Sequence, residues 1–304
     1  MKQILIVILL IASALRVSAQ DILIKNDEEK IRRNVRIVLG TEASLYAASM
    51  TGLYFLWYAD YKQSSFHFKD DSGEWLQMDK VGHATTAYHV GLIGYEALRV
   101  AGLDEKRAIL YGAPLGFVFQ TTVEIFDGFS DGWGFSWTDV AANTVGMGLF
   151  MGQQFLWHEQ RIALKYSFHT TKYAKHRPDL LGSNVLEQAL KDYNGQTYWL
   201  SCNIKSLALP DDCRFPAWLN IAFGYSADGM TGAYENVLEH NGKTIPAYRR
   251  TRQFLISPDI DLTRIPVKNK FWKTTLKVLS FIKIPFPTFQ FDDNGCCDWY
   301  WLYF

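Results

Sequence analysis

QTTVEIFDGFSDGWGFSWTDVAANTVG, residues 120–146, decides the fold of the first half of this chain. The stretch ends one apolar, helix-length segment, passes through a loop with three glycines, and begins a second such segment. Polar residues stand inside both segments, Gln120 and Glu124 before the loop and Asp139 and Asn143 after it. Buried polar groups cost several kcal/mol without partners, so we expect these side chains to converge.

A third apolar segment begins with the motif Asp79-Lys80-x-x-His83. Residues four apart share a helix face, so Asp79 and His83 are expected to lie together, with Lys80 beside them. The polar pairs on either side of the glycine-rich loop have the same spacing. Gly146, seven residues after Asp139, leaves room on that face for a neighbouring backbone or a ligand. The sequence therefore predicts one polar site built from three helices.

The candidate catalytic or binding residues are the charged and amide residues of these segments: Asp79, Lys80, His83, Glu124, Asp139 and Asn143. Carboxylate and imidazole groups together are suited to a divalent metal. Alternatively, Asp79 orients His83 as a general base, and Lys80 neutralises an anionic group of a substrate. In a third interpretation, the charges pair with one another and only fix the packing of the helices. The sequence contains no nucleophile elbow, phosphate-binding loop or dinucleotide fingerprint, so enzymatic activity, metal and cofactor stay open.

The N-terminus predicts export. A basic Met1-Lys2 pair precedes an apolar run over 4–15, and Val17-Ser18-Ala19 supplies a cleavage site before Gln20. The apolar run is shorter than the roughly 20 residues that span a bilayer, which favours a signal peptide over an anchor. No cysteine follows the cleavage site, so a lipid anchor there is not expected. We expect a cell-envelope protein at the outer membrane or a periplasmic membrane surface.

Charge and aromatic content narrow the range of partners. The chain has 31 basic and 31 acidic residues, a balance that does not favour nucleic acid as a partner. Tryptophan prefers membrane interfaces, and five tryptophans lie near predicted helix ends: Trp57, Trp75, Trp133, Trp137 and Trp157. The four apolar segments hold few charges, so we expect association with a membrane. Expected partners are a membrane lipid or another envelope component.

Periodicity predicts an α+β chain: an N-terminal bundle of about four apolar helices, then a smaller region of antiparallel strands with an amphipathic helix. The expected domains are a signal peptide over 1–19, a helical domain over 20–157 and a strand-rich region over 158–304. The four helices are predicted over 36–61, 78–101, 105–126 and 136–156, after a loose lead-in over 20–34.

The sequence predicts fewer elements in the strand-rich region than in the helical domain. Strands are predicted over 218–225, 253–262 and 299–304, a short helix over 184–193, and a basic amphipathic helix over 268–283. Within the helical domain, the motif Gly148-x-x-x-Gly152 matches the small-residue pattern of packed membrane helices.

The four cysteines fall in the last third of the chain. An exported chain permits disulfides, and Cys202 and Cys213 flank a turn across which they are able to pair. The adjacent Cys296 and Cys297 are poor partners for each other, and the spacing of metal-binding cysteine pairs is absent from the sequence. We expect a structural role for these residues.

The spaced motifs of the helical segments resemble a known family. They are Asp79-Lys80-x-x-His83-Ala84, Glu124-x-x-Asp127-Gly128-x-Ser130 and Gly134-Phe135-Ser136-x-x-Asp139-x-x-x-Asn143-x-x-Gly146. They look like the YfiM-like family of predicted periplasmic lipoproteins over about residues 78–150, and more distantly like VanZ-like membrane proteins. The C-terminal part resembles a longer branch of the first family. The resemblance implies an envelope location and brings no activity with it, and the missing lipidation cysteine departs from the family pattern.

Two functions are compatible with this sequence. In the first, a membrane-associated protein binds or acts on a lipid or cell-wall intermediate at the polar site between helices. In the second, a non-enzymatic structural or assembly factor of the envelope uses the polar residues only to lock helix packing.

Overall fold

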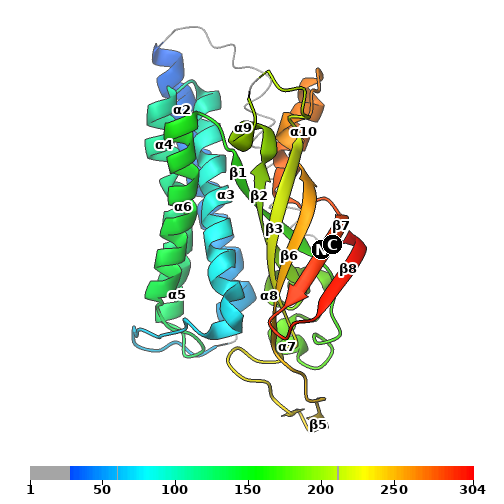
Figure 1. The fold of residues 1–304 in the computed structure, drawn as a ribbon. Helices are drawn as coiled ribbons and strands as arrows, with labels where there is room; N and C mark the ends of the chain where they lie inside the picture. Colours follow the sequence, from blue (N-terminus) through cyan, green and yellow to red (C-terminus); the bar gives the residue numbers. More distant parts are fainter. Residues whose placement is uncertain (1–27, 60, 211) are drawn as a thin grey trace. The chain divides into compact units, whose positions relative to one another are not determined.

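The computed structural model describes residues 28–59, 61–210 and 212–304, so the predicted signal peptide lies outside the described residues. Contacts divide the chain into two compact units. Among the described residues, the helical unit comprises those up to Asp71 together with His83–Glu159, and the sheet unit comprises those of Ser72–Gly82 and Gln160–Phe304. One continuous helix begins in the sheet unit and runs on into the helical unit. The α+β fold class is confirmed (Figure 1).

The helical unit contains four long helical stretches. They are α2 (Glu28–Leu53, continued by a π-helical turn Tyr54–Tyr58), α3 (Met78–Ala101), α4 with α5 (Glu105–Gly112 and Pro114–Gly128), and α6 (Trp137–Trp157). The predicted loose lead-in is wrong for residues 28–34, which belong to α2. Glu28 and Glu29 in its first turn complement the positive end of the helix dipole and favour this earlier start.

Three of the predicted helix ends are confirmed by their caps. The Asp104 side chain accepts a hydrogen bond from the backbone nitrogen of Arg107, and Gly102 ends α3 at a φ of +101°. Pro114 lies at the first turn of α5, where its missing N–H divides the predicted third helix into α4 and α5. Ser136 caps α6 through its hydroxyl oxygen.

Two buried glycines set the distances between helices. A Cβ added at Gly116 of α5 would lie 2.0 Å from the carbonyl oxygen of Ala87 on α3, and one at Gly146 of α6 would lie 2.0 Å from that of Ala84. The space predicted beside Gly146 is therefore filled by the backbone of α3. The Gly148-x-x-x-Gly152 pair plays no such part, because a Cβ at either position would meet nothing within 4 Å among the described residues.

The sheet unit is built on one six-stranded antiparallel sheet of order β1-β2-β3-β6-β7-β8. Its strands are β1 (Ile162–Phe168), β2 (Gln196–Asn203), β3 (Leu219–Asp228), β6 (Thr251–Ile260), β7 (Phe286–Asp292) and β8 (Cys297–Tyr303). Two-residue strands β4 (Glu239–His240) and β5 (Lys243–Thr244) form a separate hairpin. The helical pieces are η2 (Glu74–Gln77), α7 (Pro178–Leu181), α8 (Val185–Lys191), α9 (Ile204–Ala208), η3 (Leu262–Arg264), α10 (Lys270–Val278) and η4 (Leu279–Phe281).

The sequence prediction found β3, β6, β8 and α8, and it overextended α10, which ends at Val278 before a turn of 3-10 helix. It missed β1, β2 and β7. Their inward positions are polar, as with Lys165 and Ser167 in β1 and Thr197 and Ser201 in β2, so the apolar alternation expected of a sheet facing a core is absent.

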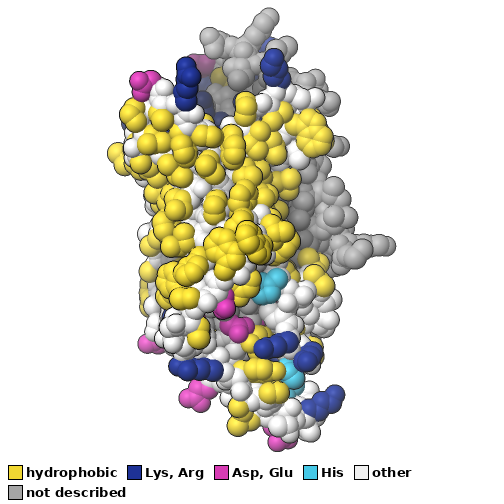
Figure 2. Space-filling view, turned by 45° about the vertical axis from the view of Figure 1, so that its right-hand side comes forward, with side chains coloured by type: hydrophobic (Ala, Val, Ile, Leu, Met, Phe, Trp, Pro, Cys, Tyr) yellow, Lys and Arg dark blue, Asp and Glu magenta, His cyan; other side chains and the backbone are white. Residues whose placement is uncertain are grey.

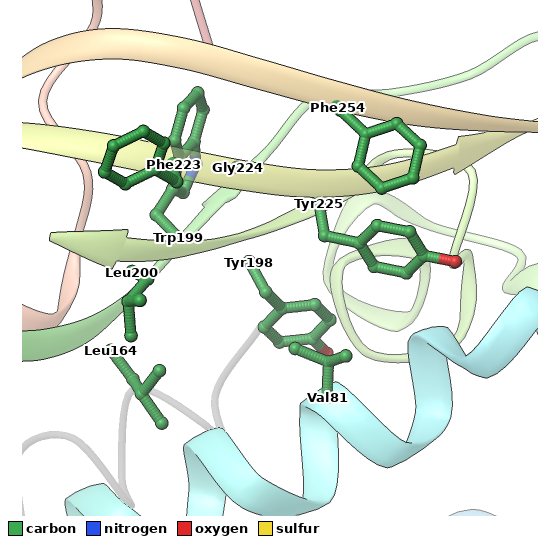
Figure 3. Close-up of a pocket in the computed structure, with 9 residues that line it drawn as sticks. All are labelled: Val81, Leu164, Tyr198, Trp199, Leu200, Phe223, Gly224, Tyr225 and Phe254. Carbon is green, nitrogen blue, oxygen red and sulfur yellow. The ribbon is translucent and has the colours of Figure 1, made fainter. Parts of the chain in front are cut away.

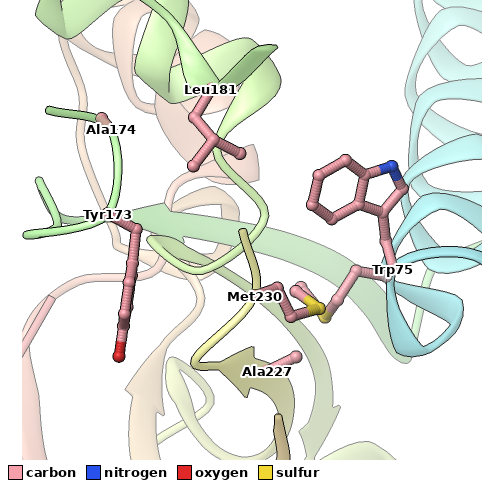
Figure 4. Close-up of a cluster of buried hydrophobic side chains, with 7 residues drawn as sticks. Trp75, Tyr173, Ala174, Leu181, Ala227 and Met230 are labelled. Atoms are coloured by element: carbon pink, nitrogen blue, oxygen red, sulfur yellow. The ribbon is translucent and has the colours of Figure 1, made fainter. Parts of the chain in front are cut away.

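Two further expectations are corrected. Trp75 is buried in an apolar cluster of the sheet unit with Met78, Leu181 and Met230, so it is not an interface tryptophan (Figure 4). All four cysteines are free thiols in the structure, so the disulfide between Cys202 and Cys213 is not formed.

The inward side of the sheet holds a buried group of charges. Lys165 Nζ lies 2.6 Å from an oxygen of Asp259, and Lys283 Nζ lies 3.8 Å from the other oxygen. Ser201 Oγ donates a hydrogen bond to Asp259 at 2.6 Å. Lys283 Nζ also donates to Ser257 Oγ at 3.1 Å. Burial, and then repulsion from Lys165, lower the pKa of Lys283 to about 8, although Asp259 opposes the shift.

This shift predicts a pH dependence of stability. The unfolded chain keeps the Lys283 proton up to about pH 10.4, whereas the folded chain releases it near pH 8, so stability should rise between these values. The rise amounts to roughly 3 kcal/mol when the whole window is crossed. Urea unfolding at pH 7.5, 8.5 and 9.5 measures it. The Lys283→Met variant should lack this contribution, and an equal slope in both proteins would contradict the assignment.

Candidate functional site

The predicted residues from three helices meet around His83. Gln120 Nε2 of α5 lies 3.2 Å from His83 Nδ1, and Asn143 Oδ1 of α6 lies 3.1 Å from the same nitrogen. On the other side of the ring, His83 Nε2 lies 3.6 Å from Glu124 Oε1. Glu124 and Asn143 are almost fully buried, and the His83 side chain is 13% exposed. We call His83, Gln120, Glu124, Asp139 and Asn143 the His83 cluster.

The hydrogen bonds restrict the state of the imidazole. If Gln120 donates to Nδ1, the ring carries its proton on Nε2 and directs it toward the Glu124 carboxylate. If Nδ1 instead carries the proton, it donates to Asn143 Oδ1. Asn143 Nδ2 has no hydrogen-bond acceptor among the residues that the structure describes, although the side chain is fully buried. The cluster therefore retains an unused donor in its interior.

A second set of bonds fixes Glu124 and the start of α6. The backbone nitrogen of Ser136 donates to Glu124 Oε2 at 3.1 Å, and the Ser136 hydroxyl donates to Asp71 Oδ1 at 2.5 Å. Thr138 also donates to Asp71, at 2.8 Å. Sequence reasoning missed Asp71 because it lies outside the predicted helices and its partners are more than sixty residues away in the sequence. Asp139 is buried on the first turn of α6, where its backbone nitrogen bonds to Ser136.

Asp79 and Lys80 occupy the first turn of α3, in the part of that helix that belongs to the sheet unit. Lys80 Nζ lies 3.1 Å from Asp79 Oδ2, and the Tyr193 hydroxyl donates to Asp79 Oδ1 at 2.6 Å. Tyr193 was not predicted, because it follows the short helix α8 in a polar stretch without a recognisable motif.

This arrangement permits two kinds of chemistry. Ligand atoms of His83 and Asp139 lie within 4.8 Å of each other, so one chemistry is the binding of a divalent cation by these two side chains of the helical unit. The second chemistry is proton transfer, because a buried carboxylate beside an imidazole is suited to general acid–base catalysis. Both require a ligand to enter the helical unit.

The glycine-rich loop after α5 is held in place. Ser64, His67 and Lys69 donate backbone hydrogen bonds to Phe129, Gly128 and Phe135 at 2.8, 2.9 and 3.0 Å. His67 Nε2 also lies 2.7 Å from the carbonyl oxygen of Trp133. These bonds favour a fixed connector over the mobile lid that the glycines also permit.

Gly128→Val is expected to disturb this connector. A Cβ at Gly128 would lie 2.4 Å from the Phe66 ring, so Phe66 or the end of α5 must move. Overpacking of this kind costs about 1–3 kcal/mol, and Phe66 is partly exposed, so the loss should fall near the lower end. Thermal unfolding measures it, with the exposed Ser65→Val as the matched control. Equal melting temperatures for the two variants would contradict the packing described.

The outside of the helical unit is apolar over large areas. Exposed hydrophobic side chains stand on all of its long helices, among them Ile37, Phe55, Tyr111, Val145 and Leu156. One helical stretch of the described chain, Glu105–Gly128, is long and apolar enough to cross a membrane. Figure 2 shows one face of the whole molecule, on which hydrophobic side chains fill a broad middle area and charged side chains lie toward the two ends.

Comparison with known proteins adds one match. Residues 45–152 match the model of a family described as predicted periplasmic lipoprotein (DUF2279). The matched range contains the whole His83 cluster and ends before the sheet begins. No curated protein and no solved structure matches the chain.

Proposed function

We propose that the helical unit is membrane-associated and binds a lipid or a lipid-linked cell-wall intermediate, with the polar group of that molecule held at the His83 cluster. The family match to predicted periplasmic lipoproteins supports an envelope location. Within the envelope, the proposal places the protein at the outer membrane or a periplasmic membrane surface. The resemblance to YfiM-like proteins, and more distantly to VanZ-like membrane proteins, agrees with this location.

The observation that carries the proposal is the unused donor of Asn143. A fully buried N–H group without an acceptor destabilises the folded protein by about 1–3 kcal/mol. Such a group is therefore expected where a ligand or a water molecule supplies the hydrogen-bond acceptor. An oxygen-rich group, such as a phosphate or a carboxylate, offers the acceptor that Nδ2 lacks. His83 on the neighbouring helix holds the oxygen of the same amide, with Nδ1 3.1 Å from Asn143 Oδ1.

The apolar exterior supports the lipid part of the proposal. Exposed side chains such as Phe55 and Leu156, 69% and 75% exposed, are costly in water and favourable against hydrocarbon chains. A ligand of this site needs a polar group for the buried cluster and an apolar part for the apolar exterior. An amphipathic molecule such as a lipid has both. If this is correct, the protein should sediment with membranes after cell disruption and remain there until detergent is added.

The alternative is a purely structural cluster in an envelope assembly factor. The bonds from Ser136 to Glu124 and Asp71 favour it, because they fix the start of α6 without any ligand. The two functions predict opposite responses to isosteric changes. If the cluster is a binding site, the variant protein should lose its ligand and keep nearly the same melting temperature. If the cluster is a structural lock, the variant protein should lose thermal stability.

His83→Gln and Asp139→Asn separate these functions. We expect the melting temperature of the detergent-extracted, full-length protein to change by less than about 3 °C while its bound lipid is lost. His158→Gln is the matched control, because this histidine is largely exposed and lies at the far end of α6. A fall of about 10 °C or more in both site variants, but not in the control, would favour the structural lock.

A further inference from the structure

The polarity of the six-stranded sheet is inverted relative to that of a water-soluble sheet. On one side of the sheet the buried residues are mostly polar, around a small apolar cluster of Trp199, Ala222, Leu255 and Tyr303; the polar ones include Thr197, Ser201, Ser226, Ser257, Asp259, Thr288 and Gln290. The opposite side carries apolar side chains between 37% and 45% exposed: Leu200, Phe223, Phe254, Ile256, Phe289 and Phe291. We call these six residues the apolar sheet face. Soluble antiparallel sheets direct apolar residues inward and polar residues outward, whereas sheets that face lipid show the reverse.

A cavity of about 310 Å³ opens on the apolar sheet face. It is lined by Val81, Leu164, Tyr198, Trp199, Leu200, Phe223, Gly224, Tyr225 and Phe254. Figure 3 shows Val81 of α3 across from the side chains of Leu164, Tyr198 and Leu200. All of these residues belong to the sheet unit.

The lining offers no charge and no unused hydroxyl. The Tyr198 hydroxyl donates to Gln196 Oε1 at 2.7 Å, and the Tyr225 hydroxyl donates to the carbonyl oxygen of Leu76. A polar ligand group would therefore lose its water without gaining a partner in this cavity. Only a hydrocarbon group fits this chemistry.

A neighbouring surface points to a lipid as the source of that group. On the amphipathic helix α10, Phe271 and Trp272 are each 55% exposed and stand beside the exposed Lys273. The 3-10 turn η4 continues α10 with exposed Leu279 and packs next to β1. Exposed aromatic residues with lysine on an amphipathic helix are typical of surfaces that bind anionic phospholipid headgroups.

We propose that the apolar sheet face is a second lipid site, in which the cavity holds an acyl chain of a membrane phospholipid. This site is separate from the His83 cluster and does not depend on the function proposed for it. The phospholipid headgroup remains at the membrane surface, where the exposed Lys273 of α10 offers it a positive charge. The sheet unit thereby contacts a membrane without its strands having to cross one.

Photocrosslinking of the full-length protein tests this site. The protein is reconstituted in vesicles of phosphatidylethanolamine and phosphatidylglycerol that contain a tracer phosphatidylcholine with a diazirine at the end of one acyl chain. We expect crosslinked peptides from β2, β3 and β6. Leu200→Asp with Phe223→Asp should lower their yield at least about ten-fold, because each carboxylate costs more than 1.4 kcal/mol against hydrocarbon.

Two control variants show whether a loss of crosslinking is specific to the apolar sheet face. Val185→Asp with Leu207→Asp places the same charges on exposed apolar positions of α8 and α9, and it should leave the yield unchanged. His83→Gln should also leave crosslinking on the sheet unchanged, which separates this inference from the proposed function. If the aspartate variant does not fold, serine at the same positions replaces it.

Three results would overturn the proposal. One is a wild-type protein whose crosslinks lie only in the helical unit. Another is an equal yield on the sheet in the aspartate or serine variant. The third is a wild-type protein that is dimeric and carries no lipid adducts on β2 and β3, and that becomes monomeric in the aspartate variant, which would assign the face to a second copy of the chain.

Discussion

Gly146→Ala is expected to destabilise the helical unit by more than about 3 kcal/mol, because the added methyl group has no space. Its carbon would lie 2.0 Å from the carbonyl oxygen of Ala84 and 3.0 Å from the Ala84 Cα, both in the backbone of α3. A helix backbone does not move aside as a flexible side chain does. Relief requires α6 to shift away from α3, which also separates Asn143 from His83.

Gly148→Ala provides the matched control on the same helix. A Cβ there meets nothing within 4 Å among the described residues, so only helix propensity changes, and alanine should stabilise by about 0.5–1 kcal/mol. Denaturant unfolding followed by circular dichroism measures both variants. Equal stability of the two would contradict the close contact between α3 and α6.

Asp259→Ala is expected to destabilise the sheet unit by about 3–5 kcal/mol, because it leaves the buried ammonium group of Lys165 without its counter-ion. Lys165 and Asp259 side chains are 2% and 0% exposed, so solvent does not screen the loss. Ser201 loses its acceptor at the same time. The cost arises from uncompensated burial more than from the loss of an attractive pair.

A combined variant distinguishes these two causes. Asp259→Leu with Lys165→Met and Lys283→Met removes all three charges and should be more stable than Asp259→Ala alone. Asp293→Ala, at an exposed position, should change stability by less than about 0.5 kcal/mol. Urea unfolding at pH 7 orders the four proteins. A combined variant that is less stable than the single one would show that the charge group stabilises the sheet.

The helical unit could be predicted largely from the sequence because its signals are local. Helix ends are marked by Asp104 and Ser136, which form cap hydrogen bonds within a few residues, and by Pro114, which lacks an N–H. The four-residue spacing of the polar groups places them on one helix face. The short loop between α5 and α6 predicted that Glu124 and Asp139 approach each other, and His83 needed only one helix hairpin more. Whether this cluster is a functional site stays a prediction.

The sheet unit could not be predicted as fully because its pattern is inverted. With Lys165 and Ser167 facing inward in β1, and Thr197 and Ser201 in β2, these two strands show no apolar alternation that points to a core. Asp71 was missed for a different reason. Its bonds to Ser136 and Thr138 span more than sixty residues, and no local motif signals a contact of that range.

The central claim is that the His83 cluster holds the polar group of a lipid, and a native mass spectrum of the full-length protein tests it most directly. Protein extracted from its membrane in a mild detergent should carry an added mass that fragments as a phospholipid or a lipid-linked intermediate. His83→Gln and Asp139→Asn should lose that mass while remaining folded, and His158→Gln should keep it. A wild-type protein of bare polypeptide mass, or one whose added mass is the same in all variants, would contradict the claim.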